Sequence, residues 1–228
     1  MSLSSIRRQV VSCQRCGRLR AYCARVAQEK RAAYRDEDYW GRPLPGFGDP
    51  RARLLIVGLA PGAHGANRTG RMFTGDRSGD FLLNAMHGAG LANLSTSQHA
   101  KDGLKLASAY ITAVVRCAPP ENKPTPKEIR NCQPFLEAEL ASLAQVRVVV
   151  ALGRIAYDAY WRLAAARGVT PRPRPKFAHG AVFQADGIPS LVTSYHPSQQ
   201  NTNTGTLTAS MLADVFGKAK ELAGIRKS

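Results

Sequence analysis

The chain has 228 residues, of which 32 are Lys or Arg and 16 are Asp or Glu, so its formal net charge is +16 and its pI is near 10.2. Apolar residues make up 44% of the sequence, which suffices for a buried core and excludes a disordered chain, a collagen-like repeat and a disulfide-dense miniprotein. Because so many cations repel one another in a compact fold, the excess favours a polyanionic partner, either nucleic acid or an acidic membrane surface.

No apolar stretch reaches the ~18 residues that a transmembrane helix needs, so we expect no membrane span. The N-terminal residues lack the long apolar run of a secretory signal, and Cys13 and Cys16 follow too soon for a transit peptide. We therefore expect a cytoplasmic protein, whose cysteines are metal ligands or catalytic groups more often than disulfides.

Residues 1–53 form a basic segment with 12 Lys and Arg against 5 Asp and Glu. The segment ends in a stretch rich in proline and glycine over residues 43–50. We predict one or two short helices followed by an irregular arm, packed on residues 54–228 so that the whole chain is one structural domain.

Four short apolar runs predict four strands that are buried on both faces of a sheet. The runs cover residues 54–57, 110–115, 147–152 and 190–195, and helical patterns cover 78–89, 125–143, 154–166 and 206–222. Because the strands alternate with helices, we predict a single three-layer α/β domain with a central, mostly parallel four-stranded sheet. Ligands of such sheets bind at the carboxyl ends of the strands.

The five cysteines suggest a site with four thiolates. Two residues separate Cys13 from Cys16, 14 residues separate Cys117 from Cys132, and Cys23 stands alone. This set suits zinc or a 4Fe–4S cluster, and the alternative is that the two distant cysteines are small buried residues. Zinc sites usually use two close pairs, so the wide second spacing favours iron–sulfur, and we expect Cys23 to be a packed thiol.

A glycine-rich loop follows the first predicted strand. Residues 58–71 read GLAPGAHGANRTGR, and their four glycines let the backbone approach a ligand closely. The spacing matches neither a Walker loop nor the dinucleotide fingerprint. Phe73 and Asp76 follow before the next helix, so the loop could hold a planar ring by stacking and backbone hydrogen bonds. The alternatives are a flexible surface loop and, for Asp76, a helix N-cap.

His196 comes directly after the last predicted strand, where a side chain is well placed for chemistry. A lone histidine is more often structural, so its position alone leaves both roles open. Residues 199–205, QQNTNTG, then form an uncharged polar run before the last predicted helix.

Three of these motifs together resemble the uracil-DNA glycosylase superfamily, and most of all its UdgB branch, also called family five. They are GLAPGAHG at 58–65, FTGD at 73–76 and HPSQQNTNTG at 196–205. The resemblance runs from Cys13 to about Leu222, nearly the whole chain. The cysteines Cys13, Cys16, Cys117 and Cys132 fall where that branch holds a structural 4Fe–4S cluster, so the resemblance implies an iron–sulfur-braced N-terminal arm on a uracil-DNA glycosylase-like domain.

The resemblance implies a monofunctional glycosylase that hydrolyses the N-glycosidic bond of uracil, and of hypoxanthine and xanthine, in double-stranded DNA and leaves an abasic site. The target base must leave the stack before its glycosidic carbon can be reached. By analogy with the family, Phe73 stacks on the flipped base, His196 stabilises negative charge on the leaving base, and Asp76 activates water or stabilises the sugar cation. The other implied contacts are to the base from Gly58, Leu59, Ala60, Pro61, Gly62 and Asn122, and to DNA from Gln199, Gln200, Asn201, Thr202, Asn203 and Arg71.

The first motif departs from the pattern of many relatives. Those relatives carry an Asp or Asn where this chain has Ala60, and another branch has a Glu where it has Leu59. Neither side chain can polarise water, and the resemblance implies that Asp76, which matches the Asp used by the branch that the chain resembles, supplies the catalytic carboxylate. A pocket without a polar side chain at Ala60 also fits a broad range of deaminated bases.

Two other functions remain open at this point. A non-catalytic DNA damage-binding protein on the same scaffold would show salt-dependent affinity for DNA without base release. A zinc-dependent hydrolase would need ligands with an open coordination position, and no His, Asp and Glu stand at such a spacing. We expect the protein to be a monomer.

Overall fold

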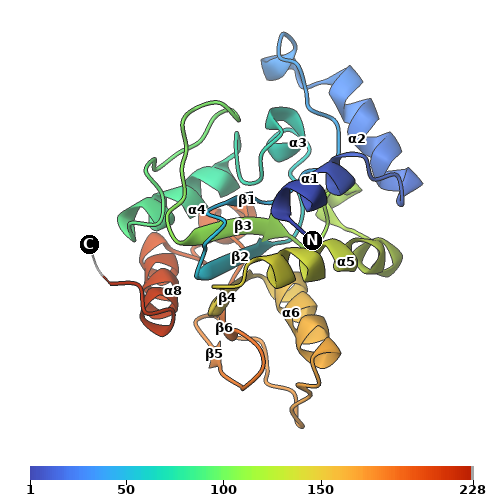
Figure 1. Ribbon diagram of the computed structural model, residues 1–228. Coiled ribbons are helices and arrows are strands. Elements are labelled where there is room, and N and C mark those ends of the chain that lie inside the picture. The colour runs from blue at the N-terminus through green and yellow to red at the C-terminus, as the bar shows by residue number, and fades with distance from the viewer. Residues whose placement is uncertain (227–228) are drawn as a thin grey trace.

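Six strands form one twisted sheet in the computed structural model, which describes residues 1–226 (Figure 1). The strands are β1 (Phe47–Gly48), β2 (Leu54–Gly58), β3 (Ala109–Ala113), β4 (Val148–Leu152), β5 (Val182–Phe183) and β6 (Ser190–Ser194). The helices are α1 (Leu3–Val11), α2 (Gly17–Glu29), α3 (Ala66–Thr69), α4 (Arg77–Gly88), α5 (Pro126–Ser142), α6 (Arg154–Ala166), α7 (Gln199–Asn203) and α8 (Ala209–Leu222), with short 3-10 turns η1 (Ala32–Tyr34) and η2 (Pro120–Asn122).

The strand order is β1-β3-β2-β4-β6-β5, and the four inner strands are parallel. These four are the predicted strands, but the predicted four-stranded sheet is corrected to a mixed six-stranded one. The outer strands β1 and β5 pair antiparallel with β3 and β6 and have two residues each, too few to show any periodicity in the sequence. β1 lies in the segment that we assign to the N-terminal arm, so that segment contributes an edge to the sheet.

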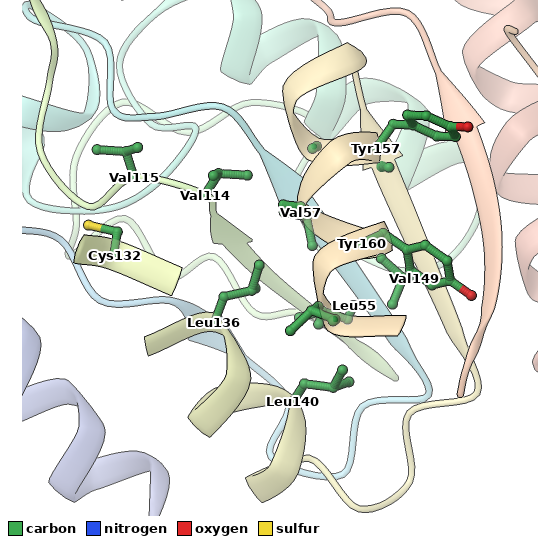
Figure 2. Packing of buried hydrophobic residues seen from close by; sticks show 14 of the residues in the cluster. Leu55, Val57, Val114, Val115, Cys132, Leu136, Leu140, Val149, Tyr157 and Tyr160 are labelled. Atoms are coloured by element: carbon green, nitrogen blue, oxygen red, sulfur yellow. The ribbon is translucent and has the colours of Figure 1, made fainter. Parts of the chain in front are cut away.

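Alternation along the inner strands sorts their side chains into two cores. On one face Leu55, Val57 and Val149 pack against α5 and α6, through residues that include Leu136, Leu140, Tyr157 and Tyr160 (Figure 2). On the other face Leu54, Ile56, Val148 and Val150 pack against α4 and α8. Because successive strand residues point to opposite faces, an unbroken apolar run serves both layers, which is the predicted three-layer arrangement.

The N-terminal helices cover the α5 side of the domain (Figure 1). Ile6 and Val10 of α1 pack on Phe135 of α5, while Leu19 and Cys23 of α2 join the core beneath α5 and α6. The segment after α2 then crosses to α3. None of the described helices is long and apolar enough to cross a membrane.

Candidate active site

Phe73 and His196 face each other beyond the carboxyl ends of β2 and β6. Their ring centroids are 6.3 Å apart and the ring planes are inclined by 32°. The Phe73 ring covers Gly58, where an added Cβ would lie 2.7 Å from two ring carbons. Phe73 also has a φ of 50°, an unusual value for a residue with a side chain and one that is often found at functional sites. The loop therefore holds a half-buried aromatic face against the end of the central strand.

His196 is fixed by the turns that follow β4 and β6. A Cβ at Gly153 would lie 3.1 Å from the Cβ of His196, and the side-chain amide of Asn201 donates to the His196 carbonyl oxygen at 2.9 Å. Burial lowers the pKa of His196 from its ordinary value of 6.5 to about 4. The imidazole is therefore neutral at pH 7, and a neutral imidazole can donate one hydrogen bond to an acceptor.

The Asp76 carboxyl group lies between the start of α4 and the glycine-rich loop. Its Oδ1 accepts from the Gly79 backbone N–H at 2.9 Å, which caps the helix. Its Oδ2 would lie 1.9 Å from a Cβ at Gly65 and 2.8 Å from one at Gly62, so the two glycines make room for the carboxylate. Burial raises the pKa of Asp76, an effect opposed by the backbone N–H groups of Gly79 and Ser78 and by the charge of Arg68, while the Asp80 carboxylate reinforces it.

The first part of the glycine-rich loop is attached to the extension of β3. The carbonyl oxygens of Gly58 and Leu59 accept from the N–H groups of Val114 and Val115 at 2.9 and 3.0 Å. Ala60 is half-buried and Pro61 is buried, while the Gly62 carbonyl accepts from the start of α3. These bonds position the backbone that we predict to line the base pocket, directly before the Asp76 contact.

The other predicted site residues lie further out. Asn122 ends η2 with a φ of 58° and is exposed, and none of its described contacts joins it to Phe73 or His196. The short helix α7 is formed by Gln199, Gln200, Asn201, Thr202 and Asn203, part of the uncharged polar run for which we predict no helix. Ser198 caps it by accepting from the Asn201 N–H at 3.4 Å. Gln199, Gln200 and Asn203 are exposed.

Arg71 serves the fold. Its guanidinium donates to Thr74 Oγ1 at 3.1 Å, to Ser97 Oγ at 2.6 Å and to the Ala100 carbonyl at 3.0 Å, and it pairs with Asp102 at 2.5 Å. The side chain is 10% exposed. Most of its five donors are therefore already used to hold residues 97–102, which leaves little capacity for the DNA contact that we predict.

The five thiols gather where α1, α2 and α5 meet the segment after β3. Cys23, Cys117 and Cys132 belong to one buried cluster, Cys16 packs against it and Cys13 packs beside Phe135. Burial raises the pKa of Cys132, and charge on Cys16 and Cys13 raises it further, while Asn131 Nδ2 donates to Cys16 Sγ at 3.4 Å. Yet no three His, Cys, Asp or Glu side chains within residues 1–226 form a group with metal-binding geometry.

One buried residue beside the site was missed by the sequence reasoning. Arg68 of α3 is 6% exposed and contacts both the glycine-rich loop and the N-terminal segment. A lone arginine carries no sequence signal of burial, because its nearby partners are backbone carbonyl groups and its side-chain partner Glu37 is 31 residues away.

Comparisons with known proteins show the family to which the chain belongs. Residues 45–220 match the model of the Uracil DNA glycosylase superfamily. A Type-5 uracil-DNA glycosylase of Mycobacterium bovis is 52% identical over 98% of this chain and 83% of its own length. A Type-5 uracil-DNA glycosylase of Thermus thermophilus is 52% identical over 95% of this chain and 96% of its own length. A Type-4 uracil-DNA glycosylase of Archaeoglobus fulgidus is 31% identical over 68% of this chain and 61% of its own length. The chain belongs to the uracil DNA glycosylase superfamily.

Proposed function

We propose that this protein is a monofunctional DNA glycosylase that hydrolyses the N-glycosidic bond of uracil, and of hypoxanthine and xanthine, in double-stranded DNA. The observation that carries the proposal is the placement of an aromatic face, a neutral imidazole and a buried carboxylate around one glycine-rich loop, from Phe73, His196 and Asp76. Relatives with about half of their residues identical over nearly the whole chain are named Type-5 uracil-DNA glycosylases.

The three groups divide the reaction between them. The flipped base stacks on Phe73, which holds it out of the helix. As the bond from the sugar carbon to the base nitrogen breaks, its electron pair moves to the base, and His196 donates a hydrogen bond to the oxygen on which that charge collects. The Asp76 carboxylate faces the cationic sugar and accepts a proton from the water that attacks it, so base and abasic sugar leave as separate products.

The pocket is suited to bases of different sizes. Residues 58–62 of the glycine-rich loop offer backbone groups and the methyl group of Ala60, with no polar side chain that would reject one ring in favour of another. Specific rejection of an analogue requires buried polar groups that the wrong ligand leaves unpaired. Deaminated pyrimidines and purines are therefore both within the proposed range.

We propose a structural 4Fe–4S cluster held by Cys13, Cys16, Cys117 and Cys132. The donor set supports it, because Cys117 and Cys132 lie in one buried cluster, Cys16 packs against that cluster and Cys13 packs beside Phe135 of α5, and thiolates are the ligands of such clusters. The cluster would tie α1 and α2 to α5 and would take no part in hydrolysis. Cys23, whose Sγ donates to the Ala118 carbonyl oxygen at 3.6 Å, would remain a buried thiol.

A panel of duplex oligonucleotides tests the proposed function. Each duplex contains uracil, hypoxanthine or xanthine opposite a normal base, and abasic sites are detected by alkaline cleavage. We expect strand cleavage for the uracil, hypoxanthine and xanthine duplexes. If the protein binds the duplexes with salt-dependent affinity but releases no base, it is instead a damage-binding protein on this scaffold.

A further inference from the structure

We propose that Arg68 is a positioning residue for base excision, and that the arm segment carrying Tyr34 and Glu37 holds Arg68 so that Asp76 faces the sugar correctly. The inference rests on the proposed function, and adds to it a connection between the N-terminal arm and the catalytic carboxylate. The juxtaposition that carries it is the position of the buried Arg68 guanidinium. On one side it bonds to the two chain segments next to the Asp76 carboxylate, and on the other side it contacts the arm.

Arg68 joins the two chain segments that enclose the Asp76 carboxylate. Its Nε donates to the His64 carbonyl oxygen at 2.8 Å and its Nη2 donates to the Gly75 carbonyl oxygen at 2.9 Å. His64 immediately precedes Gly65, against which Asp76 Oδ2 lies, and Gly75 immediately precedes Asp76 itself. A planar guanidinium has a rigid fork of donors, so these two bonds fix the separation between the loop and the carboxylate.

The arm holds the opposite side of the same guanidinium. Nη1 pairs with the Glu37 carboxylate, and the guanidinium carbon lies 3.9 Å from the centroid of the Tyr34 ring. The Trp40 backbone N–H also donates to the Arg68 carbonyl oxygen at 2.9 Å. A buried cation needs such partners, because an unpaired one would be strongly disfavoured in the interior. The arm is therefore part of the support of the catalytic site.

Arg68 acts on Asp76 through its charge as well as through its hydrogen bonds to the neighbouring segments. The groups that bear on the carboxylate are the N–H groups of Gly79 and Ser78, the acid Asp80 on α4, and Arg68 from α3, whose own charge is paired with Glu37. His64, on the loop, faces the arm and accepts or donates one hydrogen bond with Tyr39. Removal of the Arg68 cation should therefore raise the pKa of Asp76 further, in the direction in which burial already moves it.

A role only in folding would give a different result. If Arg68 merely stabilised the loop, its variants would lose stability while the folded fraction kept its catalytic constants and pH profile. If Arg68 positions Asp76, its variants have a lower single-turnover rate and an unchanged affinity for the uracil duplex. The reason is that the substitution misplaces the Asp76 carboxylate at the reacting centre and leaves the DNA-binding surface unchanged.

Three variants separate these roles in single-turnover excision from a uracil duplex at a series of enzyme concentrations, where kcat denotes the maximal single-turnover rate and KM the enzyme concentration that gives half of it. Arg68→Lys keeps the charge but loses the fork, and should lower kcat about tenfold or more with KM within about twofold. Arg68→Met also removes the charge, and should shift the acid limb of the pH profile to higher pH. Glu37→Gln keeps a hydrogen-bond acceptor for Arg68 Nη1 but removes the negative charge that pairs with it, so the arm should hold the guanidinium less firmly and kcat should fall about threefold to tenfold.

Glu29→Gln is the matched control. Glu29 lies on α2 in an exposed pair with Arg25, so its substitution removes the same negative charge from the same arm without touching Arg68. We expect wild-type kcat from it. The inference would be overturned if both folded Arg68 variants kept wild-type kcat and an unmoved acid limb while Glu37→Gln also kept wild-type kcat. It would also be overturned if Glu37→Gln and Glu29→Gln lost kcat equally. A wild-type protein that releases no uracil would overturn the proposed function itself.

Discussion

The two oxygens of the Asp76 carboxyl group have different surroundings. Oδ1 caps α4 through the Gly79 N–H, and Oδ2 lies against the glycine-rich loop. The helix-cap interpretation of this residue and the catalytic one are therefore compatible, because the cap fixes the rotamer that presents the second oxygen. Gly65 matters for the space that it leaves, since a Cβ there would lie 1.9 Å from Asp76 Oδ2.

Gly65→Ala should lower excision about 100-fold, because the new methyl group would occupy the place of Asp76 Oδ2 and move the carboxylate. The rate is measured under single-turnover conditions with a uracil duplex. Gly88→Ala is the control, since a Cβ at this α4 position meets nothing within 4 Å. Equal rates for the two variants would show that the carboxylate does not need this position.

The pH profile of excision should have one acid limb, set by Asp76. Burial raises the pKa of Asp76 above its ordinary value of 3.8, so activity should fall as pH falls through that raised pKa and the carboxylate gains a proton. His196 stays neutral down to about pH 4, so it should contribute no limb near 6.5. A limb near pH 6.5 that disappears in His196→Gln would contradict this assignment.

At the scale of elements, a buried ion pair joins the end of β3 to α5. Arg116 and Glu139 are each 1% exposed, Thr112 donates to Glu139 at 2.6 Å, and the Gly46 N–H donates to it at 3.2 Å. Arg116 directly precedes Cys117, and α5 carries Cys132. The pair therefore sets the spacing of the two segments that bring the distant cysteines together.

Arg116→Met should lower the free energy of unfolding by about 3–5 kcal/mol, because it leaves the Glu139 carboxylate buried without its partner. The measurement is urea unfolding followed by circular dichroism. Arg116→Met combined with Glu139→Leu should recover much of that loss. Arg25→Met, which breaks an exposed pair, should cost less than about 1 kcal/mol, and an equal cost for Arg116→Met would refute the account.

The sequence predicts the inner sheet well because each inner strand is one apolar run buried on both faces, as at 54–57 and 147–152. It misses β1 and β5, whose two residues each are placed by pairing with a neighbour and not by their own pattern. It also misses α7, where polar residues become helical after the Ser198 cap. Motif reasoning locates Phe73, Asp76 and His196, but not Arg68, whose contacts with Glu37 and Gly75 exist only in the folded chain.

At the scale of the whole molecule, the charge of +16 has a task in the proposed function, because a duplex must be held while one nucleotide is turned out of it. The basic arm is not a loose tail. Its helices pack on α5, its residues 47–48 extend the sheet, and its Glu37 reaches Arg68 beside the site. The arm thus contributes Cys13 and Cys16 and, through Glu37 and Arg68, reaches the segments beside the Asp76 carboxylate.

Protein purified without oxygen should contain iron and absorb visible light, and Cys16→Ser should lose both properties because it removes a proposed ligand. Cys23→Ser is the matched control, since this buried thiol lies outside the proposed ligand set and its variant should keep its iron. Iron content and the absorption spectrum are the measurements. A colourless preparation that contains zinc would contradict the proposed cluster.

Asp76→Asn tests the central claim most directly. Asn caps helices as well as Asp does, so the variant keeps the Gly79 bond and the fold while it removes the negative charge. We predict a single-turnover rate of uracil release at least about 100-fold below wild type, with no weaker binding of the duplex and an unchanged melting temperature. Uracil release at the wild-type rate would contradict the catalytic role of Asp76, and with it the proposed site.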